Sequence, residues 1–228
     1  MWLINSSVGR KVVMSITGLA LILFLTFHMS MNIVAIFSEN AYNMICEFLG
    51  ANWYALVATL GLAALFILHI FYAIWLTLQN QKARGNEKYA VYNRNKKVEW
   101  SSQNMFVLGF VVVLGLGLHL FNFWYNMQFQ EIIGNHSVSL GGATYAVTDG
   151  AGFIKYTFTQ PLYIVLYVIW LIALWLHLNH GFWSALQSMG WSNDIWFKRW
   201  KVTSTVYTTL LILGFASVMV VFFVKSLM

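Results

Sequence analysis

Five long uncharged stretches dominate the chain and restrict its fold more than any other feature. They cover roughly residues 12–37, 53–79, 104–129, 159–186 and 203–224. A helix of about 20 apolar residues, rising about 1.5 Å per residue, spans the roughly 30 Å hydrocarbon core of a bilayer. Of the 228 residues, 60% are hydrophobic and 9% are charged, whereas a soluble domain has roughly 25% charged residues. The sequence therefore predicts an all-α integral membrane bundle of five transmembrane helices, forming a single domain over residues 1–228.

The charged residues lie between these stretches and divide by sign. One side carries Arg10, Lys11, Lys82, Arg84, Lys88, Arg94, Lys96, Lys97, Lys198, Arg199 and Lys201, and the other carries Glu39, Glu47, Glu131, Asp149 and Lys155. Because basic loops stay in the cytoplasm, we expect a cytoplasmic N-terminus and a C-terminus outside. The net charge of +6 follows from these clusters and does not indicate nucleic-acid binding.

Four histidines fall one on each of the first four stretches: His28, His69, His119 and His177, with His180 about one turn after the last. An imidazole at membrane depth is unfavourable unless it is paired or binds a ligand. Counted inward from the nearest charged residues on the outer side, His28 and His119 lie 11 and 12 residues deep, and His69 and His177 both lie 22 residues deep. At about 1.5 Å per residue this predicts an outer pair and an inner pair in layers roughly 15 Å apart.

Two imidazoles from different helices at one depth suit the two axial positions of a six-coordinate haem b. Cys46 is the only cysteine, which excludes an internal disulfide, a cysteine-ligated iron–sulfur cluster and a C-x-x-C-H attachment of haem c. The sequence predicts two haem b groups, held by the outer and inner histidine pairs. Small residues one turn from a ligand leave room beside it, and they are Gly115, Ala73, Ala173 and Gly181.

Other readings of the histidines stay open at this point. A single histidine in a membrane helix is often a hydrogen-bonding residue between helices. A haem-free transporter or assembly protein, whose histidines bind a metal or each other, is the alternative from a different functional class. His180 has three candidate roles: contact with a haem propionate, a bond to a backbone carbonyl, or ligation in place of His177. His136, in an outer connection, is expected to be solvated.

Nothing in the sequence indicates substrate chemistry in this chain. It has no nucleophile–base constellation and no phosphate-binding glycine loop, and its seven acidic residues all lie in the connections. Inward carboxylates, which a proton-driven transporter needs, are therefore not expected. A redox role with the substrate chemistry on a partner chain is the expectation.

Two motifs resemble a known family. The stretch from Ser6 to Gly18, SSVGRKVVMSITG, is followed by His28-x-x-x-Asn32. It resembles the opening of the cytochrome b membrane anchor of succinate:quinone oxidoreductases, in the single-chain, five-helix, dihaem type found with bacterial succinate:menaquinone reductases and quinol:fumarate reductases. The stretch from His177 to Trp183, HLNHGFW, which continues to Gly190-Trp191, is similar to that family's fourth-helix motif.

The resemblance implies a function and a set of partners. It implies that His28 and His119 ligate the outer haem and that His69 and His177 ligate the inner haem, with His177 favoured over His180. It implies a flavoprotein subunit and an iron–sulfur subunit on the cytoplasmic face of a bacterial cytoplasmic membrane. Electrons from succinate would pass through both haems to menaquinone or another quinone. The oligomeric state of the complex stays open.

One position departs from the family. Some quinol:fumarate reductases carry a glutamate two residues before the fourth-helix ligand, and here that residue is Trp175. This favours succinate oxidation over the reverse reaction, which remains the alternative. Candidates for the quinone site are Asn32, Glu39, Tyr42, Asn122 and Trp124, and candidates to neutralise haem propionates are Arg10, Lys11, Lys82 and Arg84.

Two connections have features of their own. The outer connection 130–158 is longer than the family leads us to expect, and its alternating residues around Gly141-Gly142 predict a small hairpin. The inner connection 187–201 combines tryptophans with cations, as interfacial segments do.

Overall fold

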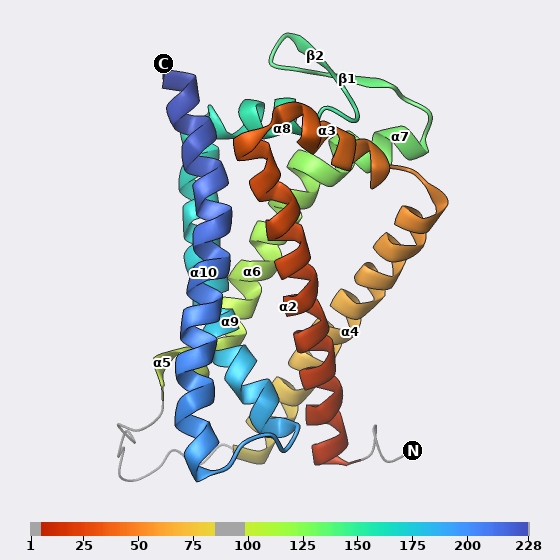
Figure 1. Ribbon diagram of the computed structural model, residues 1–228. Coiled ribbons are helices and arrows are strands. Elements are labelled where there is room, and N and C mark those ends of the chain that lie inside the picture. The colour runs from red at the N-terminus through yellow and green to blue at the C-terminus, as the bar shows by residue number, and fades with distance from the viewer. Residues whose placement is uncertain (1–5, 85–98, 228) are drawn as a thin grey trace.

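The computed structural model describes residues 6–84 and 99–227, and these are almost entirely helical (Figure 1). The elements are α2 (Ser7–Phe37), α3 (Glu39–Phe48), α4 (Trp53–Arg84), α5 (Trp100–Gln103), α6 (Met105–His119), the π-helix η1 (Leu120–Phe129), α7 (Gln130–Ile132), β1 (Ser137–Leu140), β2 (Ala143–Ala146), α8 (Gly150–Phe158), α9 (Pro161–Ser188) and α10 (Asp194–Leu227). Within the described ranges, five helical segments are long and apolar enough to cross a membrane: α2, α4, α6 with η1 and α7, α9, and α10. The predicted all-α membrane bundle of five helices is confirmed.

Helices α2 and α9 form the centre of the bundle. Helix α9 packs against α10, α2 and α6, and α2 packs also against α10 and α4. Helix α4 is the least buried and is tilted away from the others, as Figure 1 shows. The first turn of α2 and the last turn of α10 lie at opposite ends of the bundle (Figure 1).

Polar side chains set where the helices begin. Ser38 ends α2, where its N–H donates to Val34 O, and starts α3, where its Oγ accepts from the Ala41 N–H at 3.2 Å. Pro161 occupies the first turn of α9, where its missing N–H costs nothing. Helix α10 begins at Asp194, nine residues before the predicted start, because Asn193 Oδ1 accepts from the N–H groups of Ile195 and Trp196. The last eight residues of the predicted interfacial connection 187–201 are thus the first turns of a spanning helix.

The long outer connection is a folded cap. Strands β1 and β2 form the predicted antiparallel hairpin, in which Leu140 pairs with Ala143. Gly141 and Gly142 both have positive φ angles, 59° and 84°, as a tight two-residue hairpin turn requires. The hairpin leads into α8, whose Phe153 and Ile154 are buried.

Helix α8 is tied to α3 by a network of side chains. Asn43 donates to Asp149 Oδ1 at 2.7 Å and accepts from the Ala151 N–H at 2.9 Å. Asp149 in turn caps α8 through the Gly152 N–H. Cys46 lies against Gly150, and burial raises the pKa of its thiol to about 11, so the thiol stays protonated at neutral pH. This packing of α8 on α3 accounts for the length of the outer connection.

One glycine contact joins α6 to α9. Any side chain at Gly115 would overlap the indole ring of Trp170, which reaches across from α9 and donates to Val112 O at 3.0 Å. The two helices therefore approach closely only because Gly115 has no Cβ.

Replacing Gly115 by alanine should destabilise the bundle by about 1–3 kcal/mol, as overpacking of a buried contact does. The measurement is the temperature at which the purified protein unfolds in detergent. Gly117→Ala is the matched control, because it gains the same helix propensity while its Cβ would meet nothing within 4 Å. Equal behaviour of the two variants would contradict the contact assigned to Gly115.

Candidate functional site

The outer histidine pair joins α2 to α6. The ring centroids of His28 and His119 lie 5.7 Å apart, and their planes cross at 87°, so the rings are not stacked on each other. His119 is the last residue of α6 before the π-helical η1. Aromatic rings surround the pair: Phe24 and Phe215 beside His28, and Phe123, Tyr167 and Trp170 beside His119. The two imidazoles therefore lie in a largely apolar aromatic shell.

The inner histidine pair joins α4 to α9. The ring centroids of His69 and His177 lie 6.4 Å apart, with planes crossing at 70°. Thr17 of α2 contacts this pair, with its Oγ1 3.2 Å from His69 Nδ1. Two glycines lie against the rings: a Cβ at Gly18 would be 3.3 Å from His69 Cε1, and one at Gly109 would be 3.6 Å from His177 Cε1. The inner rings thus pack against bare backbone of α2 and α6.

Helices α2 and α6 each contact both pairs, so the number of residues between the contacts gives the separation of the pairs. Thr17 of α2 contacts the inner pair and His28 belongs to the outer pair, 11 residues further along. Gly109 of α6 contacts the inner pair and His119 belongs to the outer pair, 10 residues further along. At about 1.5 Å per residue, both helices put the layers roughly 15 Å apart. This agrees with the spacing expected from counting residues.

The geometry of each pair is compatible with a shared axial metal. Two imidazole nitrogens bound at about 2.0 Å on opposite sides of one metal put the ring centroids about 6 Å apart, and 5.7 and 6.4 Å bracket that value. In residues 6–84 and 99–227, no group of three or more His, Cys, Asp or Glu side chains could hold a bare metal ion. A porphyrin brings four nitrogens of its own, so two histidines complete its iron.

Two ring nitrogens are also unexplained by the protein alone. Nδ1 of His119 and Nδ1 of His177 are buried, and neither has a hydrogen-bond partner within the described part of the chain. An unsatisfied buried polar atom costs about 1–3 kcal/mol. A structural hydrogen bond from Nδ1 to another helix therefore does not account for His119 or His177 within the described part of the chain.

The space that the sequence suggested beside the ligands is only partly available. The Trp170 indole fills the room beside Gly115, so this glycine serves helix packing. Near His177, a Cβ at Gly181 would lie 3.6 Å from the Met105 side chain. Ala73 is half-buried and Ala173 is buried. The bare backbone next to the rings lies instead at Gly18 and Gly109, on helices that do not carry the histidines they contact.

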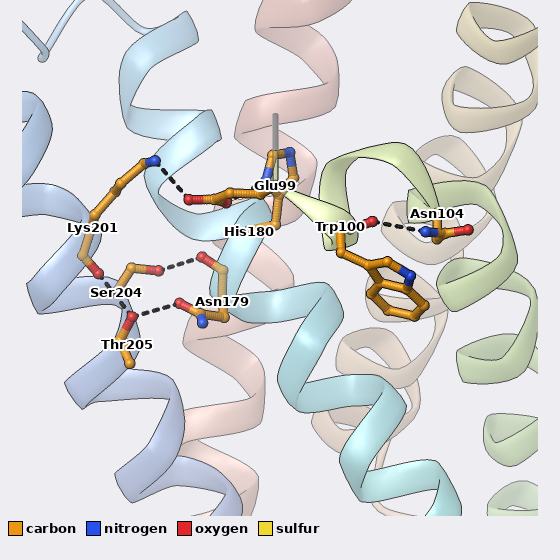
Figure 2. Close-up of polar contacts among 8 residues, drawn as sticks. All are labelled: Glu99, Trp100, Asn104, Asn179, His180, Lys201, Ser204 and Thr205. Atoms are coloured by element: carbon orange, nitrogen blue, oxygen red, sulfur yellow. Dashed lines mark hydrogen bonds and ion pairs between the residues drawn. The ribbon is translucent and has the colours of Figure 1, made fainter. Parts of the chain in front are cut away.

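His180 lies in a different environment, shown in Figure 2. Its Nδ1 is 3.4 Å from Glu99 Oε2, and Lys201 Nζ is 2.6 Å from Glu99 Oε1. Its ring packs against Trp183, with centroids 4.9 Å apart. His177, and not His180, faces His69. The inner ends of α9 and α10 are thus joined to the start of α5 by a cluster of charged and hydrogen-bonding groups.

The charges of this cluster act on Glu99. Partial burial by itself raises the pKa of a carboxyl, but hydrogen bonds from Lys201 and His180 outweigh burial and hold the pKa of Glu99 below its ordinary value. The carboxylate is therefore ionised at neutral pH.

The candidate quinone residues divide into separate places. Tyr42 donates to Asn32 Oδ1 at 3.0 Å, and the Asn32 amide donates to His28 O at 2.7 Å, so these two lie next to the outer pair. Asn122 donates to the hydroxyl of Tyr167, which packs on His119. Glu39 lies 3.6 Å from Lys225 at the surface. The exposed Trp124 donates from its indole to Oε1 of the buried Gln128.

The basic candidates are described only in part. The Arg10 guanidinium lies over the Trp75 ring, 5.5 Å from its centroid. Lys11, near the start of α2, and Lys82, near the end of α4, are exposed. The start of α2 and the end of α4 lie at the same end of the bundle (Figure 1). The side chain of Arg84, and Lys88, Arg94, Lys96 and Lys97, lie outside the described residues. His136 is exposed, as expected.

Several residues of the two sites were not identified from the sequence. They are Thr17, Gly18, Gly109, Tyr167 and Trp170, and each contacts a histidine from a neighbouring helix. Looking only at positions one turn from each histidine could not find them. Counting residues inward along every helix could have found Thr17 and Gly109, because both lie at the level of the inner pair.

Comparison of the chain with models of protein families, with curated proteins and with solved structures gives no match.

The pH dependence of stability should reveal the Glu99 cluster. Because the folded-state pKa of Glu99 is lowered, its stabilisation is present above the unfolded-state value of about 4.3 and is lost as the pH falls through the folded-state value. We expect Glu99→Gln to lower the unfolding temperature slightly at pH 7, since such partly exposed pairs contribute roughly 0–1 kcal/mol. The difference from wild type should close as the pH falls through the folded-state pKa of Glu99. Glu47→Gln, at an exposed position of α3, is the control; a pH profile of Glu99→Gln that parallels wild type would contradict this assignment.

Proposed function

We propose that this chain is the dihaem cytochrome b subunit that anchors a succinate dehydrogenase in the cytoplasmic membrane of a bacterium and passes its electrons to menaquinone. One observation carries the proposal: four histidines from four spanning helices meet as two pairs, with ring centroids 5.7 and 6.4 Å apart, at two depths. Interhelical hydrogen bonding would not require both pairs to have the spacing of axial ligands.

In this proposal His69 and His177 hold the inner haem, and His28 and His119 hold the outer one. Bound haem supplies reversible one-electron oxidation and reduction of its iron. The residues of the chain orient the imidazoles and exclude water from them. At the outer pair, the rings of Phe24, Phe215 and Trp170 exclude water.

The partners follow from the charge of the two ends. Lys11, Lys82, Lys198 and Lys201 belong to one end of the bundle, which the positive-inside rule assigns to the cytoplasm. The iron–sulfur subunit would dock there, beside the inner pair and the haem that this pair would hold, and the flavoprotein subunit behind it would carry out the dicarboxylate chemistry. The C-terminal end of α10 then faces outward.

The quinone is proposed to bind near the outer pair. Asn32 and Tyr42 lie on the His28 side, and Asn122 and Tyr167 on the His119 side, so amide and hydroxyl groups that can bind quinone carbonyl oxygens lie next to this layer.

Two residues before His177, the Trp175 indole donates to Thr209 Oγ1 at 3.0 Å. The absence of a carboxylate at that position supports succinate oxidation as the working direction.

A reduced-minus-oxidised spectrum with haem counted per chain tests the proposal. Wild type should bind two b-type haems. Alanine at His69 or His177 should remove one of them, and alanine at His28 or His119 should remove the other, because each haem would lose one of the two histidines that would hold it. His180→Ala and His136→Ala should keep both. A wild-type protein that folds without haem would overturn the assignment.

Reporter fusions test the orientation. Alkaline phosphatase, which folds only outside the cytoplasm, should be active when fused after Leu227 and inactive when fused after Lys82. A fluorescent protein that folds only in the cytoplasm should give the opposite pattern at both points. Active phosphatase after Lys82 would reverse the proposed topology and move the docking face to the other end.

A further inference from the structure

Thr17 is the one described residue that hydrogen-bonds an imidazole of either pair. Its Oγ1 lies 3.2 Å from His69 Nδ1, and the residue is buried on α2, with a relative exposure of 4%. Nδ1 of His119 and Nδ1 of His177, by contrast, have no such partner among the described residues. The inner pair is therefore asymmetric: one ring is held by a side chain and the other is not.

The surroundings of the hydroxyl decide the direction of this bond. Thr17 Oγ1 lies 3.0 Å from Val13 O and 3.0 Å from Met14 O, and a carbonyl oxygen can only accept. A threonine has one hydroxyl hydrogen, and the two carbonyls are the nearer acceptors. Once that hydrogen points back into α2, Oγ1 offers only lone pairs towards His69. His69 Nδ1 must then be the donor.

We propose that Thr17 is a positioning residue that fixes His69 in the tautomer with its hydrogen on Nδ1 and its lone pair on Nε2. This inference rests on the proposed function, in which Nε2 binds the inner haem iron. A neutral imidazole has one donor and one acceptor nitrogen, so holding the hydrogen on Nδ1 leaves Nε2 free to ligate. Gly18, next in sequence, provides the space in which the ring is held.

The hydrogen bond also affects the electronic properties of the ligand. An imidazole that donates from Nδ1 is a more basic ligand through Nε2. Loss of a hydrogen bond to a metal-binding histidine typically changes metal affinity by about 10–100-fold. A more basic axial ligand favours the oxidised iron. The site of His69 and His177 should therefore have a lower reduction potential with Thr17 than without it.

The test uses Thr17→Val, which keeps the shape of the side chain and removes the hydroxyl. The purified wild type and variant are titrated potentiometrically, and His69→Ala and His28→Ala identify which potential belongs to which site. Thr17→Val should raise the potential of the inner site alone and weaken its haem retention about 10-fold or more. Thr17→Ser, which restores a hydroxyl, should return both towards wild type.

Ser15→Ala is the matched control. Ser15 is also buried on α2, and its hydroxyl bonds back to Lys11 O at 2.9 Å, so this variant loses a buried hydroxyl away from the imidazole. If Thr17→Val does not fold, Thr17→Ala is compared with Thr17→Ser by the same titration. If the Thr17 variant without a hydroxyl has the same inner-site potential and haem retention as Ser15→Ala, this inference is overturned and the two-haem proposal stays intact. A wild type without haem would overturn both.

Discussion

The absence of water in the hydrocarbon core is the constraint on which this structure depends. Every backbone N–H and C=O at that depth must be bonded within the protein, and continuous helices achieve this. Side-chain hydroxyls follow the same rule: Ser15 and Thr208 each donate to the carbonyl four residues earlier. Charged side chains are confined to the ends of the bundle, where Glu99 and Lys201 pair. Nδ1 of His119 and Nδ1 of His177 are buried ring nitrogens for which this rule is not met by any partner among the described residues.

The two histidine layers differ in their physical surroundings. The outer pair lies among aromatic rings and next to a folded cap made of α3, α8 and the hairpin. The inner pair packs against two glycines and one hydroxyl, and its helix α9 continues within one turn to His180 in the charged cluster of Glu99 and Lys201. The inner layer is therefore closer to charges that can change its local potential, and the outer layer is the one enclosed by aromatic rings.

Those parts of the fold that depend on local regularities could be predicted. The five spanning segments follow from length and apolarity, the hairpin from Gly141-Gly142, and the two depths from the constant rise of a helix. The early start of α10 could not be predicted, because the charged residues from Asp194 to Lys201 are typical of a connection. The Asn193 cap nevertheless starts the helix there. Helix α8 could not, since its burial depends on contacts with α3. The roles of Thr17 and Gly109 depend on which helices are neighbours, which no periodicity reveals.

Helix α2 contributes to both histidine layers, through Thr17 at one and His28 at the other. It is uninterrupted between them, so its own backbone hydrogen bonds set their separation along the helix. The rate of electron tunnelling decays exponentially with the distance between carriers. The two haems that we propose would both be held against this one continuous helix, so the tunnelling rate between them would stay nearly constant while the other helices move. The same continuous helix makes the spacing of the two layers sensitive to changes in its length. One residue inserted between Thr17 and His28 would turn His28 by about 100° out of its pair.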